Sequence, residues 1–171
     1  MSLYLFVDAE TDGLYGPFLS VAALVTNDAG AELDRFYKAV RVELDSIRSA
    51  WVAENVYPFL SGAEELVTDE SSLLEAFWSF WMRYREHALC VADVQTPVEA
   101  RLFDRCIRMD PAVRNLLGPF PFFDLSTLLL ARGIDWDADR KALSGLSLPQ
   151  HNALNDVRIT AAIWHKLLPS P

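Results

Sequence analysis

Residues 3–13 read LYLFVDAETDG, an apolar run that ends in two acids separated by a single residue. A compact apolar run of this kind is typical of a buried central strand. Side chains two residues apart on a strand point to the same side of the sheet, so we expect Asp8 and Glu10 to lie together. Burying two carboxylates is costly unless a positive charge meets them. A divalent cation does this well, and carboxylate oxygen atoms favour Mg²⁺ or Mn²⁺ over zinc.

Strand and helix patterns alternate along the rest of the chain. The spacing predicts three short-linked strands that form an antiparallel meander, followed by helices and strands in alternation. Ser71 and Ser72 are the candidate N-caps of the second helix. We therefore expect an α/β domain with a mixed sheet, in which later parallel strands are joined by helical crossovers, and with helices on both faces. The expected strands are 3–9, 18–26, 32–40, 88–94 and 120–125, and the expected helices are 46–60, 71–86, 97–109, 126–132 and 153–168.

Length and composition restrict the class of protein. The chain has 171 residues, of which 51% are apolar and 23% charged, which indicates a single globular domain over residues 1–171 with a sizeable core. The longest apolar runs, such as Leu19 to Val25, fall short of the roughly 20 residues of a membrane span. The N-terminus lacks the basic region of a signal peptide. Cys90 and Cys106 lie in apolar surroundings, which favours core thiols in a reducing compartment and a cytoplasmic protein.

The net charge of −9 is unevenly distributed. Residues 1–100 carry 6 basic and 17 acidic side chains, whereas residues 101–171 carry 9 basic and 7 acidic ones. Taken alone, a net negative charge argues against long-range attraction to polyphosphate. Acids gathered around bound cations are neutralised by them, however, and the more basic part of the chain is then free to face a phosphate backbone.

A second group of candidate catalytic and metal-binding residues lies in the stretch HNALNDV, residues 151–157. His151 stands just before the last predicted helix, Asn152 is its candidate N-cap, and Asp156 falls near its first turn. An imidazole titrates near pH ~6.5, which suits a general base at neutral pH. This helix is therefore placed to aim one acid at a metal ion and to hold a base nearby.

The two motifs together resemble those of the DEDDh-type 3′–5′ exonucleases. This superfamily contains ribonuclease T, oligoribonuclease and the proofreading domains of polymerases, on a ribonuclease H-like fold. The resemblance spans nearly the whole chain and rests on D-x-E at the end of the first strand and H-x-A-x-x-D at the last helix. It implies that Asp8, Glu10 and Asp156 bind two divalent metal ions, Mg²⁺ or Mn²⁺, and that His151 activates the attacking water.

The middle motif departs from the family pattern, which has an Asp shortly after the fourth strand. Position favours Glu99, in the first turn of the following helix, as the fourth metal ligand, whereas residue type favours Asp93 at the strand end. Asp104 lies more than a turn further on and is expected to face solvent. As an alternative to a metal role, Glu99 is an acid that stabilises the helix dipole.

Other residues are candidates for substrate contact or local structure. By resemblance, Thr11 and Leu14 match positions that meet the terminal nucleotide. Arg101, like Arg105 and Arg158, lies on a helix that is expected to border the site; each is a candidate phosphate ligand, with an ordinary solvated helix charge as the default alternative. We interpret Asp124 as a helix cap. Trp51, Tyr57 and Trp136 are candidates for stacking on a base.

The resemblance carried by these residues implies a metal-dependent 3′–5′ exonuclease that releases nucleoside 5′-monophosphates from single-stranded nucleic acid. The size of the domain, close to that of ribonuclease T and oligoribonuclease, favours RNA, and those relatives imply a homodimer. The apolar helix at 71–82 is a candidate dimer face, although we favour a core role for it. The alternatives are a DNA-trimming or proofreading exonuclease, a phosphodiesterase for short oligonucleotides, and a non-catalytic module that binds nucleic acid or protein.

Overall fold

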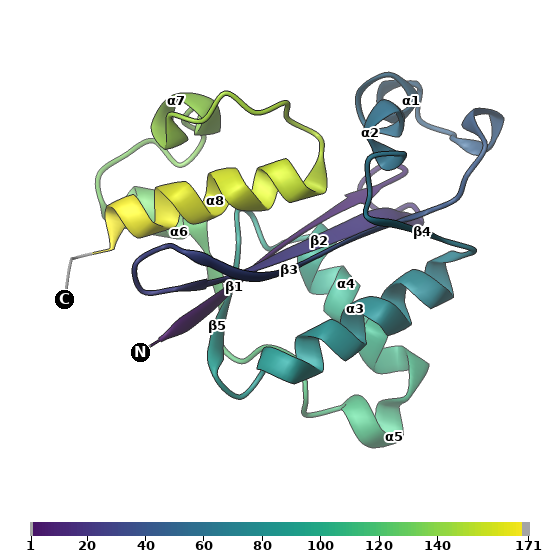
Figure 1. Cartoon of the computed structure of the whole chain (residues 1–171), viewed down its shortest axis with the longest axis horizontal. Coiled ribbons are helices and arrows are strands. Elements are labelled where there is room, and N and C mark those ends of the chain that lie inside the picture. Colours follow the sequence, from purple (N-terminus) through teal and green to yellow (C-terminus); the bar gives the residue numbers. More distant parts are fainter. Residues whose placement is uncertain (1, 169–171) are drawn as a thin grey trace.

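Six strands form one mixed sheet in the order β4-β3-β2-β1-β5-β6 in the computed structural model, which describes residues 2–168 (Figure 1). The pairs β1–β2 and β2–β3 are antiparallel, whereas β1–β5, β3–β4 and β5–β6 are parallel. The expected mixed sheet is therefore confirmed; Met1 and residues 169–171 lie outside the described part of the chain. The strands are β1 (Leu3–Thr11), β2 (Phe18–Asn27), β3 (Glu32–Val40), β4 (Glu65–Val67), β5 (Ala88–Ala92) and β6 (Phe122–Asp124).

Helices cover both faces of this sheet, as expected. In Figure 1, α8 and α6 lie on one side of the sheet, which we call the α8 face, and α3 and α4 lie on the other, the α3 face. The short helices α1 and α2 lie on the α8 face, near the N-terminal end of α8. The helices are η1 (Leu44–Ser46), α1 (Ala50–Asn55), α2 (Tyr57–Leu60), α3 (Glu70–Tyr84), α4 (Val98–Met109), α5 (Pro111–Arg114), α6 (Leu125–Ala131), α7 (Arg140–Ser144) and α8 (Ala153–Leu167).

The alternation of side chains along β1 decides where its acids point. Leu5, Val7 and Ala9 belong to the core on the α3 face, whereas Phe6 belongs to the core under α8. Because side chains alternate between the two faces of a strand, Asp8 and Glu10 continue the row that begins with Phe6. They therefore emerge on the α8 face, at the carboxyl end of the central strand.

The apolar surface of α3 is used inside the molecule. Leu73, Leu74, Phe77, Trp78 and Trp81 are all buried, and they belong to the core on the α3 face. The core interpretation of this helix is therefore confirmed. Cys90 and Cys106 are free and buried, which also agrees with the expectation. None of the described helices is long and apolar enough to span a bilayer.

The segment expected as one helix over 46–60 is instead divided into η1, α1 and α2. Ser49 caps α1 by accepting a hydrogen bond from the backbone N–H of Val52, and α1 ends at Asn55. Pro58 lies in the first turn of α2, where a proline is tolerated because its missing N–H has no helical partner there. Inside a continuous helix the same proline would remove a backbone hydrogen bond, so the chain starts a new helix. The short elements β4, α5 and α7 have no counterpart among the elements expected from the sequence.

The N-cap of α3 is Asp69, not Ser71 or Ser72, because the Asp69 carboxylate accepts a hydrogen bond of 2.8 Å from the Ser72 backbone N–H. We expect Asp69→Ala to lower the free energy of unfolding by about 1 kcal/mol. Ser71→Ala is the matched control, since Ser71 is exposed and makes no cap. Urea unfolding of the three proteins measures the difference; equal loss in both variants would contradict the assignment of the cap.

Candidate metal centre

Three carboxylates meet at the carboxyl end of β1. Asp8 and Glu10 come from β1 and Asp156 from the first turn of α8, and one oxygen atom of each lies within 4.8 Å of the others. The Oδ2 atom of Asp8 is buried without a hydrogen-bond partner among the described residues. A buried, unpartnered carboxylate oxygen is costly, and three hard oxygen donors suit a divalent cation such as Mg²⁺ or Mn²⁺. The donor set and the orphaned oxygen therefore fit a metal site.

The proximity of these acids raises their pKa values. Burial raises the pKa of Asp8 well above its usual range, and the charges of Glu10, Glu99, Asp156 and Asp93 raise it further. Burial and the charge of Asp156 raise the pKa of Glu10 to about 7. Burial raises the pKa of Asp156 to about 7, against the opposing effect of the backbone N–H groups of His151 and Asn152. In the absence of a cation the cluster therefore holds protons at neutral pH.

Glu99 approaches the same strand from the first turn of α4. Its side chain is buried, and Oε1 accepts a hydrogen bond of 3.3 Å from the Ala9 backbone N–H, between the two acids of β1. Burial raises the pKa of Glu99 to about 8 despite that hydrogen bond, and the charges of Glu10 and Asp93 act in the same direction. A fourth carboxylate thus lies beside the three-acid cluster, at the position that the sequence favoured.

Asp93 is instead neutralised by an arginine. Nε of Arg140 donates to both carboxylate oxygen atoms of Asp93, at 2.9 and 3.0 Å. The same guanidinium donates to the Ala138 and Trp136 carbonyls and to the Ser126 hydroxyl. Arg140 therefore ties the segment before α7 to the end of β5. Asp104, the third acid considered, is exposed and pairs with Arg108 at 2.7 Å, which agrees with its expected place in solvent.

His151 stands at the mouth of the acidic cluster. It lines a cavity of about 180 Å³ with Asp8, Asp93, Arg140 and Asp156, together with Gln150, Ile159 and Thr160. Its backbone adopts a φ of 62°, in the left-handed region, and Asn152 then caps α8 by accepting from the Asn155 backbone N–H. Burial and nearby Lys141 lower the pKa of the imidazole. A neutral imidazole is thus available as a proton acceptor at neutral pH.

An exposed tryptophan contacts this histidine. The rings of Trp51, in α1, and His151 meet edge to face with their centroids 4.8 Å apart. Trp51 is 53% exposed, so one part of the indole holds the imidazole and another is open to solvent. The contact joins the loop before α8 to the helices on the other side of the cluster.

Three further candidates, Thr11, Leu14 and Arg101, lie at the turn after β1. Thr11 is buried beside a bulge, whereas Leu14 is 61% exposed at the tip of the turn. Arg101 donates to the Leu14 carbonyl at 3.3 Å and lies 4.4 Å from the centroid of the Phe18 ring. Arg101 therefore supports the turn. Asp124 caps α6, as expected, by accepting from the Thr127 backbone N–H.

Two contributors to this site were not expected from the sequence. Arg140 follows a stretch rich in aspartate, in which no motif distinguishes it from a surface cation. Asp12 was read as part of a turn, yet its carboxylate accepts hydrogen bonds from the backbone N–H groups of Arg48 and Ser49, at 2.8 and 2.9 Å. Both interactions join segments far apart in the sequence, so local spacing carries no signal for them.

The sequence matches no protein-family model and no curated protein. The structure is similar to the zinc-bound complex of Escherichia coli exonuclease I with single-stranded DNA, with a TM-score of 0.71 and 13% identity. It is also similar to exonuclease I from Methylocaldum szegediense, with a TM-score of 0.68 and 14% identity, and both alignments cover 96% of this chain. The chain spans about 40% of the length of these structures. Exonuclease X in complex with 5′-overhanging duplex DNA gives a TM-score of 0.54 at 19% identity, over 96% of this chain and 90% of that one.

These likenesses show the fold. The mixed sheet with antiparallel β3-β2-β1 followed by parallel strands matches the ribonuclease H-like arrangement of those exonucleases, which confirms the expected fold class. No family model and no curated sequence supports the narrower resemblance to ribonuclease T and oligoribonuclease.

The stability of the metal-free protein is expected to fall as pH rises from about 5 to 8. Glu10 and Glu99 have pKa values near 7 and 8 in the folded protein, whereas unfolded glutamates titrate near ~4.3. The folded state therefore binds more protons in this window, so the raised pKa values give stability that is lost as these groups ionise. We expect a loss of several kcal/mol in the free energy of unfolding in EDTA, since each unit by which a folded pKa exceeds the unfolded one corresponds to ~1.4 kcal/mol.

Mn²⁺ or Mg²⁺ is expected to restore this stability, and to raise the melting temperature more at pH 8 than at pH 5.5. Asp8→Asn removes a buried charge, so this variant is expected to be more stable than the wild type in EDTA at pH 8 and to respond less to metal. Asp104→Asn is the surface control. Thermal unfolding with and without metal measures both effects, and an unchanged metal response in Asp8→Asn would place the cation elsewhere.

Proposed function

We propose that this protein is a metal-dependent 3′–5′ exonuclease that acts on single-stranded nucleic acid and releases nucleoside 5′-monophosphates. One observation carries the proposal: Asp8, Glu10 and Asp156 converge beside an imidazole, in a fold shared with exonucleases. The carboxylates are suited to binding two divalent ions, Mg²⁺ or Mn²⁺, with Glu99 as the fourth ligand. When bound, such ions neutralise phosphate charge and lower the pKa of the attacking water.

The residues of the chain then have distinct roles in hydrolysis. His151 accepts a proton from the water, whose oxygen forms a bond to the last internucleotide phosphorus. The bond from that phosphorus to the 3′-oxygen of the preceding nucleotide breaks, and this oxygen takes a proton from solvent. Burial and nearby Lys141 lower the pKa of His151, which favours the neutral imidazole that can accept the proton. Trp51 positions the ring, and Arg140 holds the segment leading to α7 in place.

The end of the substrate strand is expected to lie against the turn after β1. Thr11 shapes the turn, and the exposed Leu14 side chain is available to contact the terminal base. Arg101 supports the Leu14 carbonyl, so its effect on substrate binding is expected to act through the turn as well as through charge.

The identity of the sugar is the second part of the proposal. The size of the domain favours RNA, whereas the exonuclease I and exonuclease X structures that resemble it hold DNA. The preference for RNA gains no support from those structures, so DNA and RNA substrates are tested side by side.

A homodimer, which the resemblance implies, would use a surface other than α3. The segment with the exposed side chains Leu116 and Phe120 offers one.

A binding module that has lost catalysis is the alternative. The departure from the family pattern at the middle motif supports it, but Glu99 supplies a buried carboxylate next to β1 in compensation. The retained His151 also argues for catalysis, because binding alone needs no proton acceptor.

Nuclease activity is expected on 5′-labelled single-stranded oligonucleotides with Mn²⁺ or Mg²⁺, as a ladder that shortens from the 3′ end and disappears in EDTA. Asp8→Asn and Asp156→Asn are expected to abolish turnover because each removes a metal-ligand charge. His151→Ala is expected to lose about 10²–10⁴-fold in rate, the usual contribution of a positioned base. Asp104→Asn is expected to keep full activity. Gel analysis of matched RNA and DNA measures all four variants, and intact oligonucleotide with folded wild-type protein would support the binding module.

Comparison of Glu99→Gln with Asp93→Asn tests the middle ligand. We expect Glu99→Gln to reduce activity at least 100-fold and to weaken metal binding, because it removes a charge next to β1. Asp93→Asn is expected to lower stability, because it leaves Arg140 without its ion-pair partner, while metal affinity stays near the wild-type value. Metal titration by calorimetry and activity assays separate the two; weaker metal binding in Asp93→Asn alone would reverse the assignment.

A further inference from the structure

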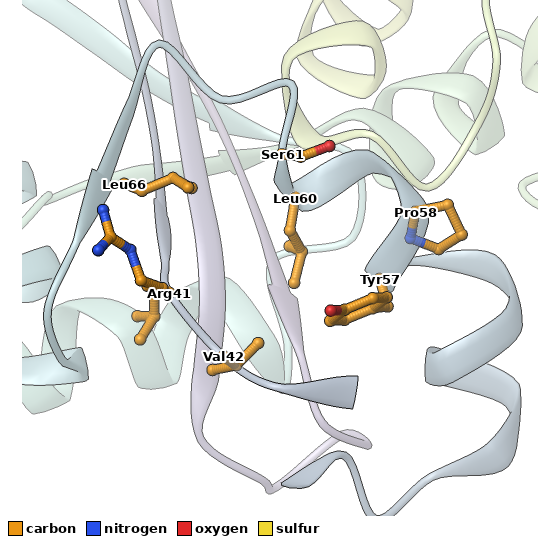
Figure 2. A pocket seen from close by; sticks show the side chains of 8 residues that line it. Arg41, Val42, Tyr57, Pro58, Leu60, Ser61 and Leu66 are labelled. Atoms are coloured by element: carbon orange, nitrogen blue, oxygen red, sulfur yellow. The ribbon is translucent and has the colours of Figure 1, made fainter. Parts of the chain in front are cut away.

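A second cavity lies beyond the metal centre, at the edge of the sheet formed by β3 and β4. It has a volume of about 330 Å³ and is drawn in Figure 2. Figure 2 shows Tyr57 of α2 on one side of the space and Arg41, just after β3, on the other, with Leu60 and Val42 between them. The cavity is therefore an open, largely apolar space with an aromatic ring and a guanidinium at its border.

The cavity and the metal centre lie at the same end of the sheet, where β1 and β3 finish. Because β1 and β3 both pair antiparallel to β2, they run in the same direction, and their carboxyl ends lie at the same end of the sheet. Ser20 of β2 pairs with Glu10 on one side and with Ala39 on the other. The cavity begins at Val40, one residue after Ala39, so one strand, β2, separates its border from the strand that carries Glu10.

A single stretch of chain connects the two sites. Residues 41–61, which we call the rim, start at Arg41 in the cavity and return to it at Tyr57. Between these points the rim is held to the end of β1, because Asp12 accepts hydrogen bonds from the Arg48 and Ser49 backbone N–H groups. Trp51, also in the rim, contacts His151. A single-stranded nucleic acid that leaves the metal centre along the rim therefore reaches the cavity.

The charges of the rim indicate what the cavity can hold. Arg41 forms no ion pair within residues 2–168, and it is exposed. The rim also contains Arg48 and the acids Glu43, Asp45 and Glu54, so it is not a basic track for a row of phosphates. An aromatic ring at the border of a largely apolar space, with an exposed guanidinium on the opposite side, suits instead a flat unpaired base and its single phosphate.

We propose that this cavity binds one unpaired base of the substrate strand, upstream of the linkage that is cleaved, by stacking on Tyr57 and by contact of its phosphate with Arg41. The inference rests on the proposed function for the identity of the ligand. The site makes the enzyme favour strands long enough to reach it, without preference for sequence.

Equilibrium binding of oligonucleotides tests the site without the need for turnover. Fluorescence anisotropy with 5′-fluorescein oligothymidylates of 2 to 10 nucleotides, in Ca²⁺ instead of Mg²⁺, measures affinity against length. A 10-nucleotide series in which a single abasic site is moved along the strand then locates the bound base. The variants are Tyr57→Leu, which keeps apolar volume without an aromatic face, Tyr57→Phe, which keeps the ring, and Arg41→Ala, with thermal unfolding as the control for folding.

We expect affinity to rise sharply once the oligonucleotide reaches one particular length. We also expect affinity to fall when the abasic site stands at the one position that matches this length. Tyr57→Leu is expected to lose about 5- to 150-fold in affinity for long strands, the range for one lost base stack, and to show no abasic penalty at that position. Tyr57→Phe keeps both, and dinucleotide affinity is unchanged in every variant. Arg41→Ala is expected to lower the slope of log affinity against log salt by about 0.7, the value for one phosphate of a single strand.

An abasic profile that is the same in the wild type and in Tyr57→Leu would overturn the inference, as would equal loss of affinity for dinucleotides and long strands. Cleavage of the same oligonucleotides in Mg²⁺ is scored separately. If the protein cleaves the oligonucleotides but no position of the abasic site changes affinity, only the base-binding site is contradicted. If affinity depends on the abasic position and on Tyr57 but no cleavage occurs, the base-binding site stands and the proposed exonuclease activity is contradicted.

Discussion

Repulsion among buried carboxylates is the constraint on which the rest of this structure depends. The central strand ends in Asp8 and Glu10, α8 brings Asp156 against them, and α4 brings Glu99. Each acid raises the cost of ionising its neighbours, and no described side chain binds Oδ2 of Asp8. The apolar cores on both faces of the sheet hold these groups together against that repulsion. Stability spent in this way is typical of a functional site.

The other acids around the centre have partners and perform structural work. Asp93 is held by Arg140, Asp12 accepts two backbone N–H groups of the rim, and Asp124 caps α6. The acids around the centre thus divide into those with a cationic or backbone partner that neutralises or caps them and those that face one another without a cation among the described residues. The hydrogen-bond and ion-pair partners of each acid, more than its position in the sequence, distinguish the two groups of acids.

The sequence predicted the parts of the molecule that depend on local pattern. The run before Asp8, the D-x-E spacing and the helix that starts after His151 are all local features, and the structure brings Asp8, Glu10 and Asp156 together. The single helix expected over 46–60 was wrong because Ser49 and Pro58 start separate helices there. The ion pair of Asp93 with Arg140 and the contact of Trp51 with His151 join distant segments, and apolar spacing contains no information about such pairs. The sequence therefore left Glu99 and Asp93 as alternatives, whereas the structure shows a different environment for each.

The pairing of the first strand with the last helix has a consequence for the order of assembly. Asp8 and Glu10 leave the ribosome near the start of synthesis, but Asp156 and His151 follow only after nearly all of the sheet has been made. The contacts that complete the cluster are thus among the most non-local in the chain, the class that forms slowly in folding. A nascent chain carries the strand acids before the helix that brings Asp156 against them, so the three-acid cluster is complete only once α8 has docked. Formation of the acidic cluster thus depends on the docking of the last helix that the chain forms.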